Sequence, residues 1–328
     1  MVLHACRVFR EDGQVVARLV EMPLDDLSAG DVVVRAEWSG VNFKDALAVT
    51  GRGAILKRFP LNAGIDVAGR VESSADTRFK AGDAVLVNGM GLGETHDGGF
   101  AQYVRVPAQW VVPLPAGLTL REAMALGTAG FTAALGLHRM EENGQRPEMG
   151  PIVVTGATGG VGSAAVSILA ARGYQVIAVS GRPEHEAYLR ALGATEIATP
   201  EALQLGTRPL ERARFGGALD NVGGSLLSGL LRHVHLWGNV VAVGNAGGPG
   251  FETTVFPFIL RGVSLLGASS ANCPMALRIE VWNRLGRELK PAHLPQIGSR
   301  AVALRDVIGA CVALLERRTQ GRTLVDCG

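Results

Sequence analysis

The chain has 328 residues, 47% of them hydrophobic and 19% charged, a balance that is typical of a folded globular protein. Its formal net charge is only +2 and it contains no basic block, which argues against a nucleic-acid partner. No apolar stretch reaches the ~18 residues of a membrane span and the N-terminus lacks a signal-peptide core, so we expect a cytoplasmic protein without membrane contact.

The first 121 residues predict a β-rich domain. Short alternating runs are separated by turn signals such as Asp12-Gly13 and Ala81-Gly82-Asp83, which indicates a partly open barrel. The predicted strands are 5–9, 15–20, 31–39, 68–73, 84–87 and 101–106.

From residue 151 strands and helices alternate, which predicts a doubly wound parallel α/β sheet of six strands. The segment 266–328 adds two helices and a closing strand, and we expect it to return to the first domain. The predicted domains are therefore 1–121 with 266–328, and 122–265 between them, with the active site in the cleft that separates the two. The six predicted strands are 152–154, 176–179, 195–198, 217–220, 239–243 and 264–268.

Residues 151–182 predict a dinucleotide site. An apolar run enters a glycine-dense loop, and a helical stretch and a second apolar run follow, which together form one βαβ unit of roughly 30 residues. Glycines in such a loop let the chain turn sharply and let backbone N–H groups approach a pyrophosphate at the positive end of the helix. The predicted phosphate-binding residues are Thr158, Gly159, Gly160, Val161 and Gly162.

The end of the second strand of this unit indicates which dinucleotide binds. An NAD site usually carries Asp or Glu about 20 residues past the loop, whereas this chain has Ser180-Gly181-Arg182. A hydroxyl and a guanidinium suit a ribose 2′-phosphate, because Arg can bind it with two N–H donors. The sequence therefore favours NADPH over NADH.

The cysteines and histidines do not indicate a metal. Cys6, Cys273, Cys311 and Cys327 are scattered and form no CxxC pair, so neither a disulfide framework nor a cysteine-bound zinc ion is predicted. The pair His233 and His235 has no third ligand near it in the sequence. We expect no metal site.

Further motifs extend over nearly the whole chain: 38–47 (WSGVNFKDAL), 60–66 (PLNAGID), 127–133 (GTAGFTA), 153–161, 178–182, 257–261 (PFILR) and 320–325 (QGRTLV). Together they resemble the medium-chain dehydrogenase/reductase superfamily and, within it, the quinone-oxidoreductase-like branch that includes the YhdH/AcuI-type acryloyl-CoA reductases. The resemblance implies a Rossmann domain joined to a GroES-like barrel domain.

The resemblance also implies a reaction. Zinc-dependent members carry a Cys in the early motif, a Gly-His-Glu triplet and a lobe of four cysteines, whereas here the triplet position reads Gly64-Ile65-Asp66 and the other two features are missing. Without zinc, the implied chemistry is hydride transfer from NADPH to the β-carbon of a 2-enoyl-CoA, with acryloyl-CoA as the expected substrate.

One departure from the group bears on the proton donor. The relatives read Asn-Tyr-Lys-Asp, and this chain has Phe43, which keeps the ring but has no hydroxyl to donate. Either that Tyr is not an acid, or water protonates the product, or the substrate differs. The catalytic candidates by position are Asn42, Phe43 and Asp45.

Other sites follow from the resemblance by position. Cofactor contacts are implied for Phe43, Thr128, Thr132, Ser180, Gly181, Arg182, Asn245, Ser270 and Arg317, of which Asn245 and Arg317 lie in stretches that depart from the group. A basic loop could meet the phosphates of coenzyme A through Arg52, Lys57 and Arg58.

Two other functions remain open. The chain could reduce a quinone or enone with NADPH, or it could be a non-catalytic NADPH sensor in which Phe43 marks lost chemistry. The family is usually homodimeric, and we expect pairing of edge strands around residues 264–268.

Overall fold

The computed structural model describes residues 1–328, and the chain divides into two compact units. Unit 1 comprises Met1–Thr128, Ala271–Arg287 and Leu294–Gly328, and unit 2 comprises Ala129–Ser270 and Glu288–His293. The changes at Thr128 and Ser270 lie a few residues beyond the predicted boundaries at 121 and 265. At the first of them, helix α2 (Leu120–Glu142) runs through the predicted boundary and bends at Gly127.

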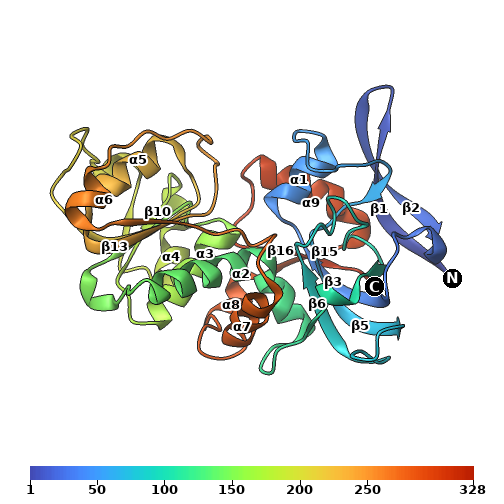
Figure 1. Ribbon diagram of the computed structural model, residues 1–328. Helices are drawn as coiled ribbons and strands as arrows, with labels where there is room; N and C mark the ends of the chain where they lie inside the picture. Colours follow the sequence, from blue (N-terminus) through green and yellow to red (C-terminus); the bar gives the residue numbers. More distant parts are fainter. The chain divides into compact units, whose positions relative to one another are not determined.

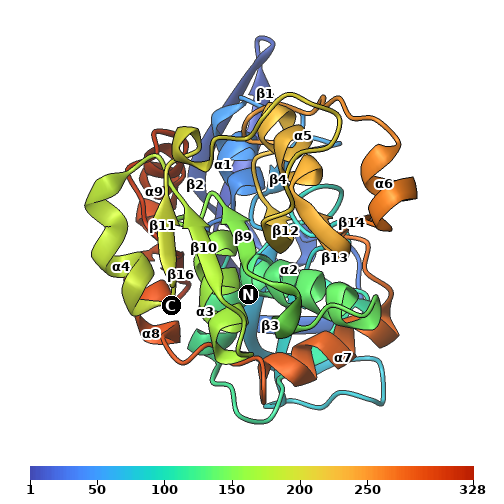
Figure 2. The ribbon, with the colours of Figure 1, turned by 90° about the vertical axis from the view of Figure 1, so that its left-hand side faces the viewer.

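Unit 2 is built on a six-stranded parallel sheet with the order β11-β10-β9-β12-β13-β14 (Figure 2). The chain starts in the middle of the sheet, moves out to one edge and then returns to build the other half, which confirms the predicted doubly wound α/β fold. The strands are β9 (Ile152–Thr155), β10 (Val176–Val179), β11 (Glu196–Ala198), β12 (Phe215–Asp220), β13 (Val234–Ala242) and β14 (Ser264–Gly267).

Helices cover both faces of this sheet, so its central strands are apolar throughout. On one face Ala218 and Val240 pack with α5, and on the other face Leu219 and Val241 lie against Gly136 of α2. The other helices of unit 2 are α3 (Gly160–Ala171), α4 (Glu186–Ala191), α5 (Gly224–Arg232) and α6 (Phe256–Arg261).

Strand β13 begins five residues earlier than the sequence predicts, because it contains a bulge. Its pairing with β12 moves from Phe215 opposite Val234 to Gly217 opposite Asn239, so the intervening residues leave the regular ladder. Leu236 and Trp237 lie in this bulge and are exposed, and Trp237 has a positive φ of 62°.

Unit 1 contains a seven-stranded sheet and a three-stranded sheet (Figure 1). The larger has the order β15-β16-β3-β5-β6-β8 with β7 beside β3, and the smaller has the order β2-β1-β4. All pairs are antiparallel except β15 with β16. This agrees with the expected GroES-like domain. The strands are β1 (Val2–Glu11), β2 (Gln14–Pro23), β3 (Val32–Gly40), β4 (Leu61–Asn62), β5 (Asp66–Ser74), β6 (Ala84–Asn88), β7 (Tyr103–Val106), β8 (Val112–Pro113), β15 (Arg300–Ala303) and β16 (Thr323–Asp326).

Two helices complete the core of unit 1 and lie side by side in Figure 1: α1 (Phe43–Thr50), which the sequence did not predict, and α9 (Val307–Leu315). Ala46 and Val49 of α1 belong to the same buried cluster as Ala310 and Cys311 of α9. Unit 1 also contains α7 (Met275–Leu285) and α8 (Leu294–Ile297). None of the helices combines the length and the apolar character that crossing a bilayer requires.

Candidate active site and cofactor site

A buried ion pair lies at the centre of the candidate active site in unit 1. Arg322, just before β16, places Nη2 3.0 Å from Oδ2 of Asp66 at the start of β5, and both side chains are almost fully buried. Thr128 also donates to the Asp66 carboxylate, through its backbone N–H at 3.0 Å and its hydroxyl at 2.6 Å. Charge-assisted bonds of this kind compensate a buried carboxylate for the hydration that it loses on folding.

Asn42 connects this pair to helix α1. Its side-chain amide donates to Asp66 Oδ2 at 2.8 Å, and its side-chain oxygen accepts a bond from Arg322 Nη1 at 2.7 Å. The same amide also lies 3.1 Å from the Gly40 carbonyl and from Asp45 Oδ2. Because its donors and its acceptor are already engaged, Asn42 holds the buried groups in place.

Asp45 is a second buried carboxylate in this network. Oδ2 accepts the backbone N–H of Asn42 at 2.8 Å, and Oδ1 accepts the backbone N–H of Ile65 at 2.9 Å. Burial and the neighbouring Asp66 charge raise the pKa of Asp45 to about 7, although these N–H donors oppose the shift. The Arg322 guanidinium bonds Asp66 and not Asp45, so the charge of Asp45 is compensated by N–H donors alone.

The bend in α2 makes room for the ion pair. Gly127 adopts φ 49° and ψ −154° inside the helix, and this turns the N–H of Thr128 toward Asp66. A Cβ at Gly127 would overlap Arg322 Nη2 and Asp66 Oδ2. Glycine is therefore required here by its conformation and by its size.

The glycine turn of unit 2 has the geometry expected of a phosphate cradle. Helix α3 begins at Gly160 after an N-cap at Gly159, and the first N–H groups of a helix have no partner within it. A Cβ at Gly162 would overlap the Gly156 carbonyl, so α3 packs directly on the turn that follows β9. The residues fit a bound dinucleotide, whose pyrophosphate would lie at this helix end.

The polar residues after β10 converge on the same turn. Arg182 donates from Nη2 to the Thr158 hydroxyl at 2.5 Å, and its backbone N–H bonds the Ser180 hydroxyl at 3.1 Å. Thr158 and Ser180 are buried, whereas Gly181 is exposed and nothing lies within 4 Å of a Cβ built on it. Three of the predicted cofactor residues are thus brought together, and the guanidinium lies between the glycine turn and the end of β10.

Asp220 at the end of β12 supports the turn from the other side. Its Oδ1 accepts the Thr155 hydroxyl at 2.6 Å and its Oδ2 accepts the Gly223 N–H at 2.7 Å, while burial raises its pKa. Thr155 ends β9, so this buried carboxylate fixes the carboxyl ends of two adjacent strands where the cofactor is expected.

The remaining predicted residues differ in exposure. Phe43 begins α1 and is 53% exposed. Asn245 and Arg317 are exposed in the segments after β13 and α9, Ser270 is half-buried, and Thr132 is buried in α2. Of the basic loop, Arg52 and Lys57 are exposed, whereas the guanidinium of Arg58 is bonded to Thr95 and Ser28.

Three important residues were not among the predicted site residues: Asp66, Arg322 and Asp220. Each is a charged residue next to an apolar run of the sequence. A charge in that position indicates a buried polar group, and this was the signal that could have identified the three residues. Their partners are distant in the sequence, up to 256 positions in the case of Arg322 and Asp66.

No group of three or more His, Cys, Asp or Glu side chains is placed to hold a metal ion. Asp66 occupies the third position of the triplet that reads Gly-His-Glu in zinc-dependent members, but four donor groups from Asn42, Arg322 and Thr128 already bind its two oxygens. The residues present do not fit a zinc ion.

Comparisons with known proteins agree with the fold. The profile of the alcohol dehydrogenase GroES-like domain matches residues 28–116, and the profile described as zinc-binding dehydrogenase matches residues 160–286. The chain is 46% identical to the acrylyl-CoA reductase AcuI of Ruegeria pomeroyi over 317 residues, 96% of each chain. YhfP of Bacillus subtilis, provisionally named a quinone oxidoreductase, is 48% identical over 99% of this chain and 98% of its own.

Solved structures are similarly close. YhdH of E. coli K-12 with bound NADPH has a TM-score of 0.95 at 44% identity, over 99% of this chain and all of that one. YhfP of Bacillus subtilis with bound NAD has a TM-score of 0.97 at 44% identity, over 99% of both chains. The two relatives therefore differ in the dinucleotide that was bound.

Replacement of Gly127 by alanine tests the packing at the ion pair. We expect Gly127→Ala to lower the free energy of unfolding by about 3 kcal/mol or more, because it combines a disfavoured positive φ with overlap at a buried charge pair. Gly13→Ala is the matched control, since Gly13 also has a positive φ but nothing lies within 4 Å of a Cβ built there. Chemical denaturation measures both variants, and equal losses in the two would contradict the steric role of Gly127.

Proposed function

Because the chain belongs to the YhdH/AcuI-type group of the quinone-oxidoreductase-like medium-chain dehydrogenases/reductases, we propose that this oxidoreductase uses NADPH to reduce the C=C bond of a short 2-enoyl-CoA, with acryloyl-CoA as substrate. The observation that carries the proposal is the 46% identity to an acrylyl-CoA reductase along 96% of both chains. The motif residues Asn42, Asp66, Thr128 and Arg322 form one bonded network, which supports an intact site.

The proposed reaction needs no metal. The reduced nicotinamide, when bound, supplies the hydride for the β-carbon of the substrate. The phosphates of the cofactor would lie at the start of α3, and Arg182 with Ser180 would bind the ribose 2′-phosphate. Asp66 retains its four donors throughout and so is not available as a zinc ligand.

Phe43 determines where the proton at the α-carbon comes from. Its ring is half exposed and has no hydroxyl, and the groups of Asn42 and Asp45 are bonded within the buried network. We assign positioning roles to Asn42 and Asp45, which fix the start of α1 and thereby the Phe43 ring. Solvent at the exposed ring then supplies the proton.

An NADPH:quinone or enone reductase is the second candidate, and the apolar exposed ring of Phe43 is the observation that favours it. The provisional name of YhfP points the same way. A non-catalytic NADPH sensor is the more remote alternative. Such a sensor would bind NADPH through the same cofactor residues.

An acceptor comparison tests the function. We expect anaerobic oxidation of NADPH with acryloyl-CoA at a kcat/KM at least about tenfold above that for benzoquinone, because a thioester contributes binding energy along the whole coenzyme A arm. Crotonyl-CoA is the control for chain length, and mass spectrometry identifies propionyl-CoA as the product. Turnover of the quinone alone would reject the thioester assignment, and NADPH binding without turnover of any acceptor would indicate the sensor.

A second prediction concerns the cofactor. We expect Arg182→Ala to raise the KM for NADPH by about tenfold to a hundredfold, because a charge-assisted contact to the 2′-phosphate is lost, and to leave the KM for NADH within about twofold. Arg190→Ala is the control, since this exposed arginine pairs with Glu186 in the helix that follows. Equal losses for both cofactors would show that Arg182 does not bind the 2′-phosphate.

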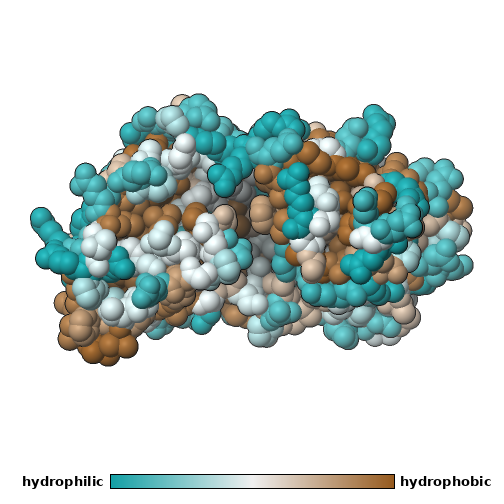
Figure 3. Space-filling view, turned by 90° about the horizontal axis from the view of Figure 1, so that it is seen from above, coloured by the Kyte–Doolittle hydropathy of each residue, from teal (hydrophilic) through white to brown (hydrophobic).

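We further propose that the protein is a homodimer that pairs through the β14 edge of unit 2. β14 is the last strand of the sheet, so its outer edge has no partner strand. Exposed apolar side chains lie in the β13 bulge and on α6: Leu236 (63%), Trp237 (72%), Ile259 (68%) and Leu260 (59%). A brown area at the lower left of Figure 3 marks apolar surface of this kind, and such patches are typical of interfaces.

Light scattering tests the dimer. We expect the wild type to have twice the monomer mass and the double variant Trp237→Glu/Ile259→Glu to be monomeric, because buried unpaired charges of the same sign oppose association. Ile279→Glu, on α7 of unit 1, is the control for an added surface charge. Retained NADPH binding shows that the double variant is folded, and a monomeric wild type would contradict the proposal.

A further inference from the structure

The basic loop after α1 contains cations with different surroundings. Helix α1 ends at Thr50, and Arg52, Lys57 and Arg58 follow within eight residues. From the sequence, all three are equally good candidates for binding the phosphates of the substrate. Their contacts in the structure separate them into two roles.

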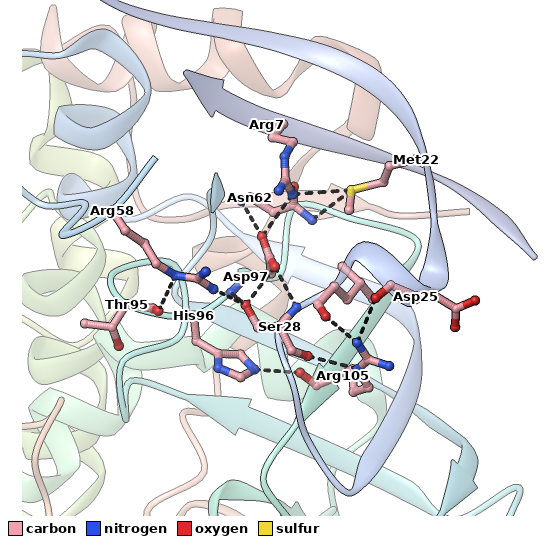
Figure 4. A network of polar contacts seen from close by, with 11 residues as sticks. Arg7, Met22, Asp25, Ser28, Arg58, Asn62, Thr95, His96, Asp97 and Arg105 are labelled. Carbon is pink, nitrogen blue, oxygen red and sulfur yellow. Dashed lines mark hydrogen bonds and ion pairs between the residues drawn. The ribbon is translucent and has the colours of Figure 1, made fainter. Parts of the chain in front are cut away.

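Arg58 fastens the loop to the rest of unit 1. Its Nε donates to the Thr95 carbonyl at 3.0 Å and its Nη2 to the Ser28 hydroxyl at 2.5 Å (Figure 4). Ser28 is itself bonded to Asp97, a buried carboxylate that also holds Arg7 at 3.1 Å. The guanidinium of Arg58 is thus one end of a connected polar network that runs through the half-buried Ser28 to the buried Asp97.

Lys57 and Arg52 have uncompensated charges. The backbone N–H of Lys57 is fixed to the Glu94 carbonyl at 2.8 Å, but its ammonium bonds only the Ala54 carbonyl, at 3.3 Å. The Glu94 carboxylate is instead paired with Lys44 at 2.7 Å. Arg52 is exposed, and no carboxylate lies within ion-pair distance of its guanidinium. The loop of residues 51–58 therefore carries two positive charges without a paired carboxylate, and Arg58 and the Lys44–Glu94 pair hold its backbone in place.

The loop of residues 51–58 is connected to the candidate active site through helix α1. Lys44 follows Phe43 at the start of α1, and the loop begins where α1 ends, about 12 Å further along the helix. A coenzyme A thioester with its acyl group at Phe43 has a pantetheine arm long enough to cover this distance. Its nucleotide end carries a diphosphate and a 3′-phosphate, which are the groups that Arg and Lys side chains bind.

We propose that Arg52 and Lys57 form a phosphate-binding subsite for the nucleotide end of the thioester, and that Arg58 and the Lys44–Glu94 pair are positioning residues for that subsite. The inference rests on the proposed function, because it assumes a coenzyme A substrate. It assigns different roles to cations that the sequence alone does not distinguish.

A comparison of KM for two thioesters isolates the contribution of the phosphate contacts. Acryloyl-CoA carries the nucleotide phosphates, and acryloyl-pantetheine does not. For the double variant Arg52→Ala/Lys57→Ala we expect a KM for acryloyl-CoA raised about tenfold, with kcat within about twofold. The KM for acryloyl-pantetheine should stay unchanged. In the wild type the KM for acryloyl-CoA should rise with salt, and the double variant should lose most of that dependence, because salt screens exposed charges.

Lys80→Ala/Arg300→Ala is the matched control, since it removes one exposed Lys and one exposed Arg from other elements of unit 1. Arg58→Ala should raise the KM for acryloyl-CoA in the wild-type background and add nothing to the double variant, because it acts through Arg52 and Lys57.

The outcomes separate the two proposals. Turnover of both thioesters with the same KM values in wild type and double variant would reject the subsite alone. An equal rise in KM for both thioesters would also reject it, because the lost contact would then not involve the phosphates. Absence of turnover of either thioester by the wild type would reject the proposed function and the subsite with it.

Discussion

The Asp66–Arg322 ion pair constrains several segments of unit 1 at once, because two charges that leave water must be compensated almost completely by hydrogen bonds. Its donors and neighbours come from four separate segments: the turn before α1, the start of β5, the bend of α2 and the turn before β16. Removing one partner of a buried pair typically costs about 3–5 kcal/mol, whereas the intact pair contributes little net stability. Its main effect is therefore to fix where these four segments lie.

This constraint accounts for motif residues that look unrelated in the sequence. Asn42 supplies an amide that bonds both members of the pair, and Thr128 supplies two donors to the carboxylate. Gly127 is small because the pair passes directly beneath it, and Gly40 is limited in the same way by the Arg322 guanidinium. Unit 2 uses a similar arrangement, in which the buried Asp220 joins Thr155 to Gly223 and so supports the glycine turn.

The sequence predicts those parts of the fold that depend on local patterns. Strands β9 and β10 and the turn between β9 and α3 are recognisable because apolar runs and glycines are adjacent there. Helix α1 was missed because it has only eight residues, and β15 because two of its four residues are exposed. The ion pair could not be found from one sequence, since nothing local relates Asp66 to a residue 256 positions away. The predicted cofactor residues Thr158, Ser180 and Arg182 do converge, because they follow neighbouring strands of one sheet.

The distance between Asp66 and Arg322 along the chain also affects how the protein is made. Synthesis proceeds from the N-terminus, and domains generally fold as units while the chain emerges. All of the residues that form the sheet of unit 2 are synthesised before Arg322, whereas Asp66 has no counter-charge until Arg322 itself has left the ribosome. The sheet of unit 2 can therefore form first, whereas unit 1 contains an unpaired Asp66 carboxylate until Arg322 and β16 have been synthesised.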